Sequence, residues 1–458
     1  MLVLRIILIW FIGLITFTNF LVAQDSVFDY KRHDVGKVRL LISNVGTLSP
    51  TGGYYSGRFN CEYPPNSGEE HIAQAGLWVG GITPDNDTLV SVTTSWNPFM
   101  SGFEFYASGE PWDTVWVVSH GNTANIPYWP DYYVGFSDQD FVCRYSDYNE
   151  AALIVPDHKP LYSDVIQTSY AWSSSLLEDV IVLSFYVIPT RWDLKGVYFT
   201  YWVVPRVGIN CSAFDCYVPD DRALFYGDLN MAVGLDGPGG TDGQAISPIG
   251  FQIFPDQADE YLAADSINWT FKYGNNRNGP PGIVPYSDSE KYRELMAGGE
   301  IMDNQVNYEG SHFVLSFGPY DLKVGDTLSF RIAVVLGEGL ADLVSNARSF
   351  YPPDVYPEPW GGPYPDDTLH IRLQLFQNFP NPFRFTTVIR YMLIDPEYVF
   401  LDIFDISGRK INTLVNAKQN PGPHVIFVDA SDYTSGVYFY RLRTRSGFRE
   451  TKKMLILK

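Results

Sequence analysis

One loop of the sequence carries residue types suited to metal binding. The stretch DGPGGTDG, residues 236–243, places Asp236 and Asp242 on either side of flexible glycines, with Thr241 as a further oxygen donor. Calcium binds about six to eight oxygen atoms, and such a loop can provide several of them. The loop does not match the EF-hand pattern, which favours a solvated turn over a calcium site. Asp236 and Asp242 are the metal-ligand candidates, and calcium is the one cofactor considered.

Four cysteines offer a second kind of chemistry. They are Cys61, Cys143, Cys211 and Cys216, and they allow three pairings if the protein reaches an oxidising compartment. The segment CSAFDC closes a small loop that is compatible with a bridge between Cys211 and Cys216, which leaves Cys61 to pair with Cys143. A zinc site is disfavoured, because the spacing is wrong for a zinc knuckle and no histidine cluster accompanies the cysteines.

Signatures of catalysis are scarce. The histidines are scattered, and the zinc-helix HExxH, nucleophile-elbow GxSxG and phosphate-binding GxxxxGK[ST] patterns do not occur. Two carboxylates that folding brings together leave no spacing to detect, so the many acidic residues neither identify nor exclude a glycosidase. The body is expected to be non-catalytic, as a surface structure or a module that binds glycan or protein. A secreted hydrolase of polysaccharide or protein is the alternative.

Tryptophans give a further indication of binding. Polar-edged aromatic rings can stack on sugars at a surface. Trp96, in SWNPF, and Trp129, in PYWPDYY, lie in turn-rich segments and are the tryptophans expected at the surface. Most of the others are expected to pack in the core.

Charge is distributed unevenly along the chain. Residues 369–458 carry 13 Lys and Arg against 7 Asp and Glu, whereas residues 1–368 carry 19 against 45. Binding of nucleic acid or an anionic membrane requires clustered cations, so the acidic part is not expected to bind either by charge. The change of sign coincides with the proline-rich residues 351–368, which are expected to form an extended linker between domains.

The first residues have the form of a secretory signal. Arg5 precedes a long apolar core that ends near the small residue Ala23. Residues 1–23 are therefore predicted to be a cleaved signal peptide. An uncleaved membrane anchor is the alternative, because the stretch is almost long enough to span a bilayer, but the polar residues near its end and after it favour cleavage.

Residues 24–350 have the pattern of an all-β body. Aromatic residues make up 16% of the chain and charged residues 18%, and glycines and prolines are frequent, which favours strands joined by tight turns. One or two β-sandwich domains with a few short helices are predicted. Helices are expected from Asp288, where Ser287 and Glu290 can form a capping box, and in residues 339–350. The strand-like runs are residues 75–82, 113–120, 179–189, 196–205 and 326–337.

The C-terminal residues 369–458 form a more regular pattern. Seven short strand-like runs, most of them separated by turn residues, predict a seven-stranded immunoglobulin-like sandwich. The runs are residues 371–376, 386–393, 399–405, 410–415, 424–429, 436–443 and 451–458.

Two of these runs allow the faces of the strands to be assigned. Leu401 and Ile403 share one face and are expected in the core, while Phe400, Asp402 and Phe404 form a mixed face. The run GVYFYRLR is apolar or aromatic on both faces apart from its arginines. That strand is therefore expected to be covered on both sides.

The same region resembles a known family. QNFPNPF (377–383), TTVIRYML, LDIFDISGRKINTLV (401–415), SGVYFYRL (435–442) and the terminal ETKKMLILK resemble, in this order, the type A sorting domain of type IX secretion substrates. The resemblance implies recognition by an outer-membrane translocon and its sorting machinery. It also implies that the protein is secreted or held at the outer-membrane surface after cleavage of the signal peptide.

The resemblance assigns sorting residues to three kinds of position, namely turns, strand edges and positively charged sites. The prolines are expected to keep a strand edge from pairing and the glycines to form a hairpin and begin a strand. Lys452, Lys453 and Lys458 either contact an acidic partner or solubilise the last strand. The sorting-motif residues are Pro380, Asn381, Pro382, Gly408, Arg409, Gly436, Lys452 and Lys453.

A second resemblance concerns the body. Residues 316–339, SFGPYDLKVGDTLSFRIAVVLGEG, resemble a segment found in uncharacterised exported β-rich proteins that end in this sorting domain. The resemblance implies membership of that group of exported proteins and names no activity.

Overall fold

The computed structural model describes most of the chain. The described residues are 28–49, 60–94, 104–108, 110, 113–129, 132–209, 221–237, 245–255, 262–263, 266–275, 287–308, 310–350, 374–375, 378, 381, 383–384, 386–393, 396–420, 422–431 and 433–457. The chain divides into two compact units, Met1–Tyr364 and Pro365–Lys458. Their boundary falls within the predicted linker, and both this linker and the predicted signal peptide lie outside the described residues.

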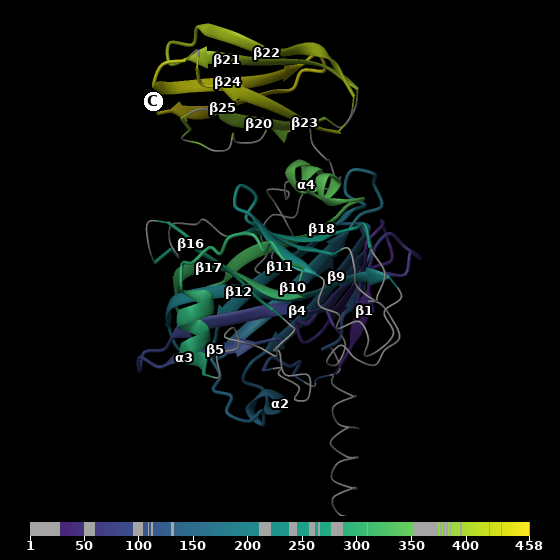
Figure 1. The fold of residues 1–458 in the computed structure, drawn as a ribbon, viewed down its shortest axis with the longest axis vertical. Coiled ribbons are helices and arrows are strands. Elements are labelled where there is room, and N and C mark those ends of the chain that lie inside the picture. Colours follow the sequence, from purple (N-terminus) through teal and green to yellow (C-terminus); the bar gives the residue numbers. More distant parts are fainter. Residues whose placement is uncertain are drawn as a thin grey trace, which may run out of the picture. The chain divides into compact units, whose positions relative to one another are not determined.

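The first unit contains two antiparallel sheets of eight strands each (Figure 1). The first sheet consists of β1 (Tyr30–Arg32), β2 (Arg39–Ser43), β3 (Cys61–Glu62), β4 (Glu69–Ile82), β12 (Leu194–Ile209), β17 (Ser311–Leu322) and β16 (Asn268–Asn275), in this spatial order, with β5 (Thr88–Val92) paired to β4. The second consists, in order, of β13 (Arg222–Tyr226), β14 (Met231–Leu235), β15 (Ile249–Phe254), β18 (Leu328–Leu336), β11 (Val180–Pro189), β10 (Ser163–Ala171), β9 (Gln139–Ser146) and β6 (Trp116–Val118). A separate pair joins β7 (Thr123–Ala124) to β8 (Tyr133–Val134).

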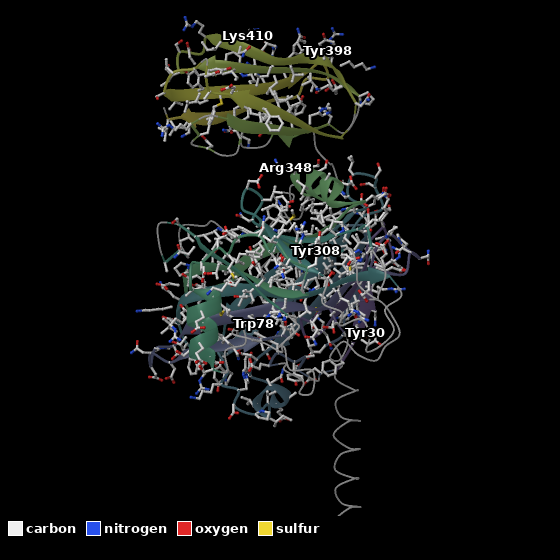
Figure 2. All side chains as sticks on the ribbon, in the orientation of Figure 1. Tyr30, Trp78, Tyr308, Arg348, Tyr398 and Lys410 are labelled. Atoms are coloured by element: carbon white, nitrogen blue, oxygen red, sulfur yellow. The ribbon has the colours of Figure 1, made fainter. Side chains whose placement is uncertain are left out.

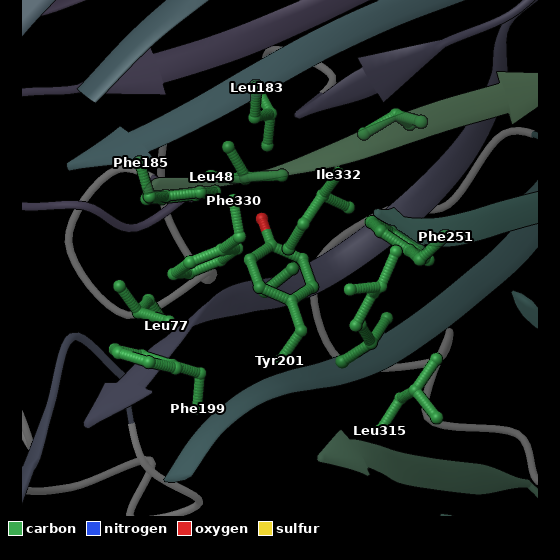
Figure 3. Packing of buried hydrophobic residues seen from close by; sticks show 14 of the residues in the cluster. Leu48, Leu77, Leu183, Phe185, Phe199, Tyr201, Phe251, Leu315, Phe330 and Ile332 are labelled. Atoms are coloured by element: carbon green, nitrogen blue, oxygen red, sulfur yellow. The ribbon is translucent and has the colours of Figure 1, made fainter. Parts of the chain in front are cut away.

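The two large sheets pack against each other through one apolar core. Figure 3 shows side chains of both sheets meeting there, including Phe199 from β12 and Phe330 from β18. Their ring centroids are 4.9 Å apart, and Phe185 from β11 stacks on Phe330 at 5.1 Å. Burial of aromatic rings between two sheets is the main stabilising force of a sandwich. The predicted all-β body is confirmed.

The central strands are also buried on their outer faces. The α3 turn (Asp288–Glu290) continues into the π-helix η2 (Lys291–Met296), whose Leu295 and Met296 cover Trp78 and Trp202 on the first sheet. The helix α4 (Leu340–Ser349) covers the outer face of the second sheet through Leu343 and Ala347. Strands covered on both sides need apolar residues at nearly every position, which explains the continuous apolar and aromatic runs 183–188 of β11 and 198–204 of β12.

The helices begin where the sequence predicts. Ser287 and Glu290 form the expected capping box, and α4 occupies the second predicted segment. The sequence does not predict the change from α- to π-geometry at Lys291 or the short helix α2 (Glu150–Leu153), which Asn149 caps. In the described parts of the chain, no helix combines the length and apolar character needed to cross a membrane.

The C-terminal unit has the seven predicted strands. They are β19 (Gln374–Leu375), β20 (Thr386–Leu393), β21 (Glu397–Asp405), β22 (Lys410–Gln419), β23 (Gly422–Asp429), β24 (Gly436–Thr444) and β25 (Arg449–Ile456). One sheet has the order β19-β20-β23 and the other β22-β21-β24-β25. Leu401 and Ile403 lie in the core between them with no exposed surface, as predicted.

Candidate functional site

The proline-containing segment 377–383 of the sorting motif protects the edge of the last strand. Asn381 accepts a hydrogen bond at its Oδ1 from the backbone N–H of Leu455, at 2.7 Å. Phe383 donates its N–H to the carbonyl of Leu455 and accepts from the N–H of Leu457. These bonds occupy the free edge of β25, which would otherwise present unpaired backbone groups. Pro380 and Pro382 lie outside the described residues.

The DISGR segment is a hairpin turn, as the sequence predicts. Gly408 has φ +81°, a conformation that glycine adopts without strain, and its N–H donates to the carbonyl of Asp405. The Asp405 carboxylate accepts from the backbone N–H groups of Ser407 and Arg409 and pairs with the Arg409 guanidinium at 3.0 Å. The hydrogen bonds from Ser407 and Arg409 hold the pKa of Asp405 below its ordinary value. Gly408 and Arg409 therefore build the turn between β21 and β22.

The outer face of the four-stranded sheet carries a row of arginines stacked on aromatic rings. Strand β21 supplies the rings, and the arginines come from β24, its hydrogen-bonded neighbour, and from the turn that follows β24. The guanidinium carbon lies 4.5 Å from the ring centroid in the pair Arg441–Phe404, 5.1 Å in Arg443–Phe400 and 4.3 Å in Arg445–Tyr398. Such stacking restrains both partners and leaves the edges of the guanidinium for hydrogen bonds.

One carboxylate lies at the centre of this row. Asp402 is 1% exposed and accepts hydrogen bonds from the Thr413 hydroxyl, at 2.6 Å, and from Arg443, at 3.0 Å, with the Lys410 ammonium 3.5 Å away. Burial alone would raise the pKa of Asp402, but these hydrogen bonds and the two cations hold the pKa below its ordinary value. Figure 2 shows Lys410 and Tyr398 on this sheet. Asp402 thus stays ionised and fixes the register of three strands.

The two adjacent lysines of the sorting motif lie on opposite faces. In the β24–β25 register, Lys453 lies opposite Phe439 on the outer face and is exposed. Lys452 lies opposite the core residue Tyr440 and pairs with Glu450 at 3.1 Å. Of these two lysines, Lys453 alone shares the face of the arginine row. Gly436 begins β24 with φ +154°, and Lys458 lies outside the described residues.

The calcium candidates cannot be compared as a pair, because Asp242 lies outside the described residues. Asp236, which follows β14, is buried, and its Oδ2 accepts the N–H of Ala245 at 2.5 Å. Among the described residues, no group of three or more His, Cys, Asp or Glu side chains is placed to hold a metal ion. Asp236 acts in the structure as an acceptor that closes the loop 236–245.

The structure corrects the expected pairing of Cys61 with Cys143. Both thiols are free and fully buried. Cys61 belongs to β3 of the first sheet and Cys143 to β9 of the second, where each packs in the core as a small apolar side chain. Burial raises the pKa of both thiols. The predicted bridge between Cys211 and Cys216 lies outside the described residues.

The structure also corrects the surface placement of Trp129. The side chain is 4% exposed and forms an edge-to-face contact with Tyr133, at a centroid distance of 4.9 Å. The segment between β6 and β9 folds back over the outer face of the second sheet, and Trp129 packs there against Tyr186. Turn-rich sequence around a tryptophan therefore did not mean exposure. Trp96 lies outside the described residues.

Sequence reasoning missed the buried carboxylates of the body. Asp140 accepts from the Tyr133 hydroxyl and from the backbone N–H groups of Phe136 and Ser137. Asp147 accepts from the Ser91 hydroxyl and from two backbone N–H groups at Leu161 and Ser163. Carboxylates used in this way organise loops. The partners of Asp147 are distant in sequence, so spacing gives no signal for it.

A partly exposed aromatic cluster of the body was also missed. Tyr162 stacks on Tyr148 at 5.6 Å and contacts Trp192 edge to face at 4.8 Å. The exposed Arg191 lies over both Tyr162 and Trp192, at 4.3 and 4.9 Å. Asp164 accepts from the Tyr148 hydroxyl. The cluster brings together ring edges, hydroxyl groups and a cation, the groups that polar ligands contact.

Comparison with solved structures finds distant likenesses. CopC from Methylosinus trichosporium OB3b shares 16% identity over 19% of this chain and 91% of its own, with a TM-score of 0.15. A polysaccharide lyase shares 10% identity over 66% of this chain and 36% of its own, at a TM-score of 0.22. The adhesin domain of Epf from Streptococcus pyogenes shares 10% identity over 65% of this chain and 92% of its own, at 0.15. Likenesses at these scores assign no function to the body.

Comparison with protein families gives a definite result for the C-terminal unit. No curated protein matches the chain significantly. Residues 377–457 match the family described as the secretion system C-terminal sorting domain. The match spans the turn, edge and arginine-row residues described above. Residues 377–457 are therefore the sorting domain of a type IX secretion substrate.

Proposed function

We propose that the protein is a type IX cargo whose C-terminal sandwich directs export, and that its body is a non-catalytic β-protein of the cell surface or medium. The observation that carries the proposal is the family match at residues 377–457. It is supported by the structure of the C-terminal unit, which has its own apolar core and two complete sheets. A separately folded unit can be recognised without unfolding the body that precedes it.

The buried polar groups of the body support a structural rather than a catalytic role. The carboxylates of Glu70, Asp140 and Asp147 each accept several hydrogen bonds, mainly from backbone amides. A general acid or base must instead place an oxygen that donates or accepts a proton within hydrogen-bond reach of a substrate. We assign to these groups the task of holding the ends of strands and loops.

We further propose that the body binds a glycan or a protein through the cluster of Tyr148, Tyr162, Arg191 and Trp192. The cluster offers hydroxyl groups and a cation at a partly exposed aromatic surface. Binding by purified mature protein on a glycan array should be lost in R191A/Y148A and kept in the control Y132A, whose ring is 52% exposed elsewhere. Turnover of a polysaccharide or peptide pool by the same protein would overturn the non-catalytic assignment.

Export is tested by truncation and transfer. In a type IX-competent bacterium, a chain ending at Tyr364 should accumulate folded in the periplasm, while the full chain reaches the surface or medium. A reporter with a signal peptide, fused to residues 351–458, should be exported. Normal export of the truncated chain would contradict the proposal, because the body would then contain its own export signal.

A further inference from the structure

The outer face of the sheet β22-β21-β24-β25 is strongly cationic. Strand alternation and the observed register place six lysines and arginines on it, and the contact of Arg445 with Tyr398 adds a seventh. They surround Asp402, which has the one carboxylate among the described side chains of that face. We call this surface the basic face. It consists of Lys410, Lys418, Arg441, Arg443, Arg445, Arg449 and Lys453, with the rings of Tyr398, Phe400, Phe404 and Phe439.

The arginines of the basic face are held at a regular spacing. Arg441 and Arg443 are alternate residues of β24, so they lie about 6.5–7 Å apart along the strand direction, and Arg445 follows in the turn after the strand. Each guanidinium stacks on a ring of β21, which restricts its rotamers before any partner binds. Pre-organised side chains lose less conformational entropy on binding than free ones.

The hydrogen bonds within the sheet leave most guanidinium donors unused. Arg441 donates from Nε to the Thr451 hydroxyl, and Arg443 donates from one terminal nitrogen to Asp402. A guanidinium has about five N–H donors, arranged to bind a carboxylate through two bonds. Donors therefore remain on both side chains, at the strand spacing.

Apolar groups accompany the cations on and beside this face. Val437, Phe439 and Leu455 lie on it half-buried. Ile406, at the tip of the adjacent β21–β22 hairpin, is 78% exposed, and Ile411 on β22 is 40% exposed. Arginines and aromatic rings are enriched at protein interfaces, and apolar area contributes to binding another protein more than to binding a phosphate polymer.

We propose that the basic face is the surface by which the sorting domain docks on an acidic protein segment of the export machinery. An extended segment with carboxylates at alternate positions repeats at the same spacing as the arginines, and its apolar neighbours can cover Phe439 and Leu455. This inference rests on the proposed function, since it names the surface and the partner chemistry of the same domain.

Export of the full chain is the first test. The variant R441Q/R443Q/R445Q removes three positive charges from the basic face, and the matched control K159Q/K195Q/K323Q removes three from exposed lysines of the body. We expect export to fall by about tenfold or more in the first variant and to stay unchanged in the control. If the first variant unfolds, R441Q/R445Q leaves the partners of Asp402 in place and tests the same surface.

Photo-crosslinking identifies the partner. A photoreactive residue replaces Phe439 on the basic face or, as the control, Phe427, which is 66% exposed on β23 of the other sheet. We expect an adduct from position 439 alone, mapped to an acidic segment of another protein and lost in R441Q/R445Q. An adduct with this chain itself, or arginine-dependent binding of the purified chain to phosphatidylglycerol vesicles with no protein adduct, would overturn the proposal.

The proposed export function and the proposed docking surface can be refuted separately. If the chain ending at Tyr364 is exported normally, the proposed function fails. If that chain is retained but folded R441Q/R443Q/R445Q is exported like the wild type, the sorting role stands and the basic face is excluded as the docking surface.

Discussion

Asp402 is expected to contribute more to the stability of the sorting domain than its position on an outer sheet face suggests. Its carboxylate is 1% exposed and has three partners on two neighbouring strands, Thr413, Arg443 and Lys410. The variant D402A removes the charge and all three interactions. It leaves Arg443 and Lys410 able to reach water, since their side chains are 43% and 55% exposed.

The size of the effect follows from these exposures. A hydrogen bond to a charged acceptor contributes about 1.5–3 kcal/mol when it is sheltered from water, which applies to the bond from Thr413. The ion pairs with the half-exposed cations contribute about 1 kcal/mol or less. We therefore expect D402A to lower the free energy of unfolding by about 2–3 kcal/mol. In a domain of this size, about 1 kcal/mol shifts Tm by about 4–8 °C, so the expected loss is on the order of 10–20 °C.

Scanning calorimetry of the full chain should show this loss in the transition of the C-terminal unit and leave that of the body unchanged. The control D429A removes an exposed carboxylate that accepts from the backbone of Ser431, and its cost should stay below about 1 kcal/mol. A shift in D402A no larger than that in D429A would refute the reasoning.

The pH dependence of the same variant gives a second check. The pKa of Asp402 is lowered in the folded protein, so its contribution is complete above the ordinary value of 3.8 and is lost as the pH falls through the folded pKa. The difference between wild type and D402A should therefore be constant near neutral pH and shrink in acid. A difference that grows on acidification would contradict an ionised Asp402.

Three further predictions concern other sites. Cys61 and Cys143 should resist alkylation in the native protein because both are buried, and both should react in urea without reductant because both are free. If the masses of the peptides that contain them do not change on alkylation in urea, the two cysteines are bridged. G408A should destabilise the sorting domain by about 1 kcal/mol in the same calorimetry, since alanine is strained at φ +81° although no atom crowds its Cβ. Burial raises the pKa of Glu70 to about 7, although four backbone amides donate hydrogen bonds to its carboxylate. Between about pH 7 and the ordinary value of 4.5, the folded body therefore binds a proton at Glu70 that the unfolded chain does not bind. The free energy of unfolding of the wild-type body, measured by denaturant titration, should therefore rise as the pH falls from about 7 to about 5, and E70Q should lack part of this rise.

Local pattern was sufficient to predict the seven C-terminal strands and, in the body, the strands β4, β6, β11, β12 and β18. Alternation and turn residues located the seven C-terminal strands and placed Leu401 and Ile403 in their core. Continuous apolar runs identified the strands buried on both faces. These features depend on neighbours within a few residues, which a sequence displays directly.

Local pattern does not predict contacts between residues that are far apart in the sequence. Cys61 and Cys143 were expected to pair because they remained after Cys211 and Cys216, but both are free in the core. Sequence spacing does not reveal where two distant strands place their side chains. Trp129 lies among turn residues, yet its segment folds back onto a sheet and buries it. In both cases tertiary packing decided the environment.

The basic face shows how register turns ordinary residues into a surface. The alternation of Arg441 and Arg443 is visible in the sequence and puts both on one face of β24, and Arg445 joins them through its contact with Tyr398. The apolar and aromatic residues on both faces of this strand predict that both faces are covered by other layers. In the structure the guanidinium groups themselves cover the rings of β21, and this requires the register that sets Phe400 opposite Arg443 and Asp402 opposite Arg441. A shift by one residue would turn the arginines toward the core of the sandwich, where their charges would lose water without gaining partners. The ionised Asp402 opposes that shift, so the residue that stabilises the fold also keeps the arginines available on the outer face.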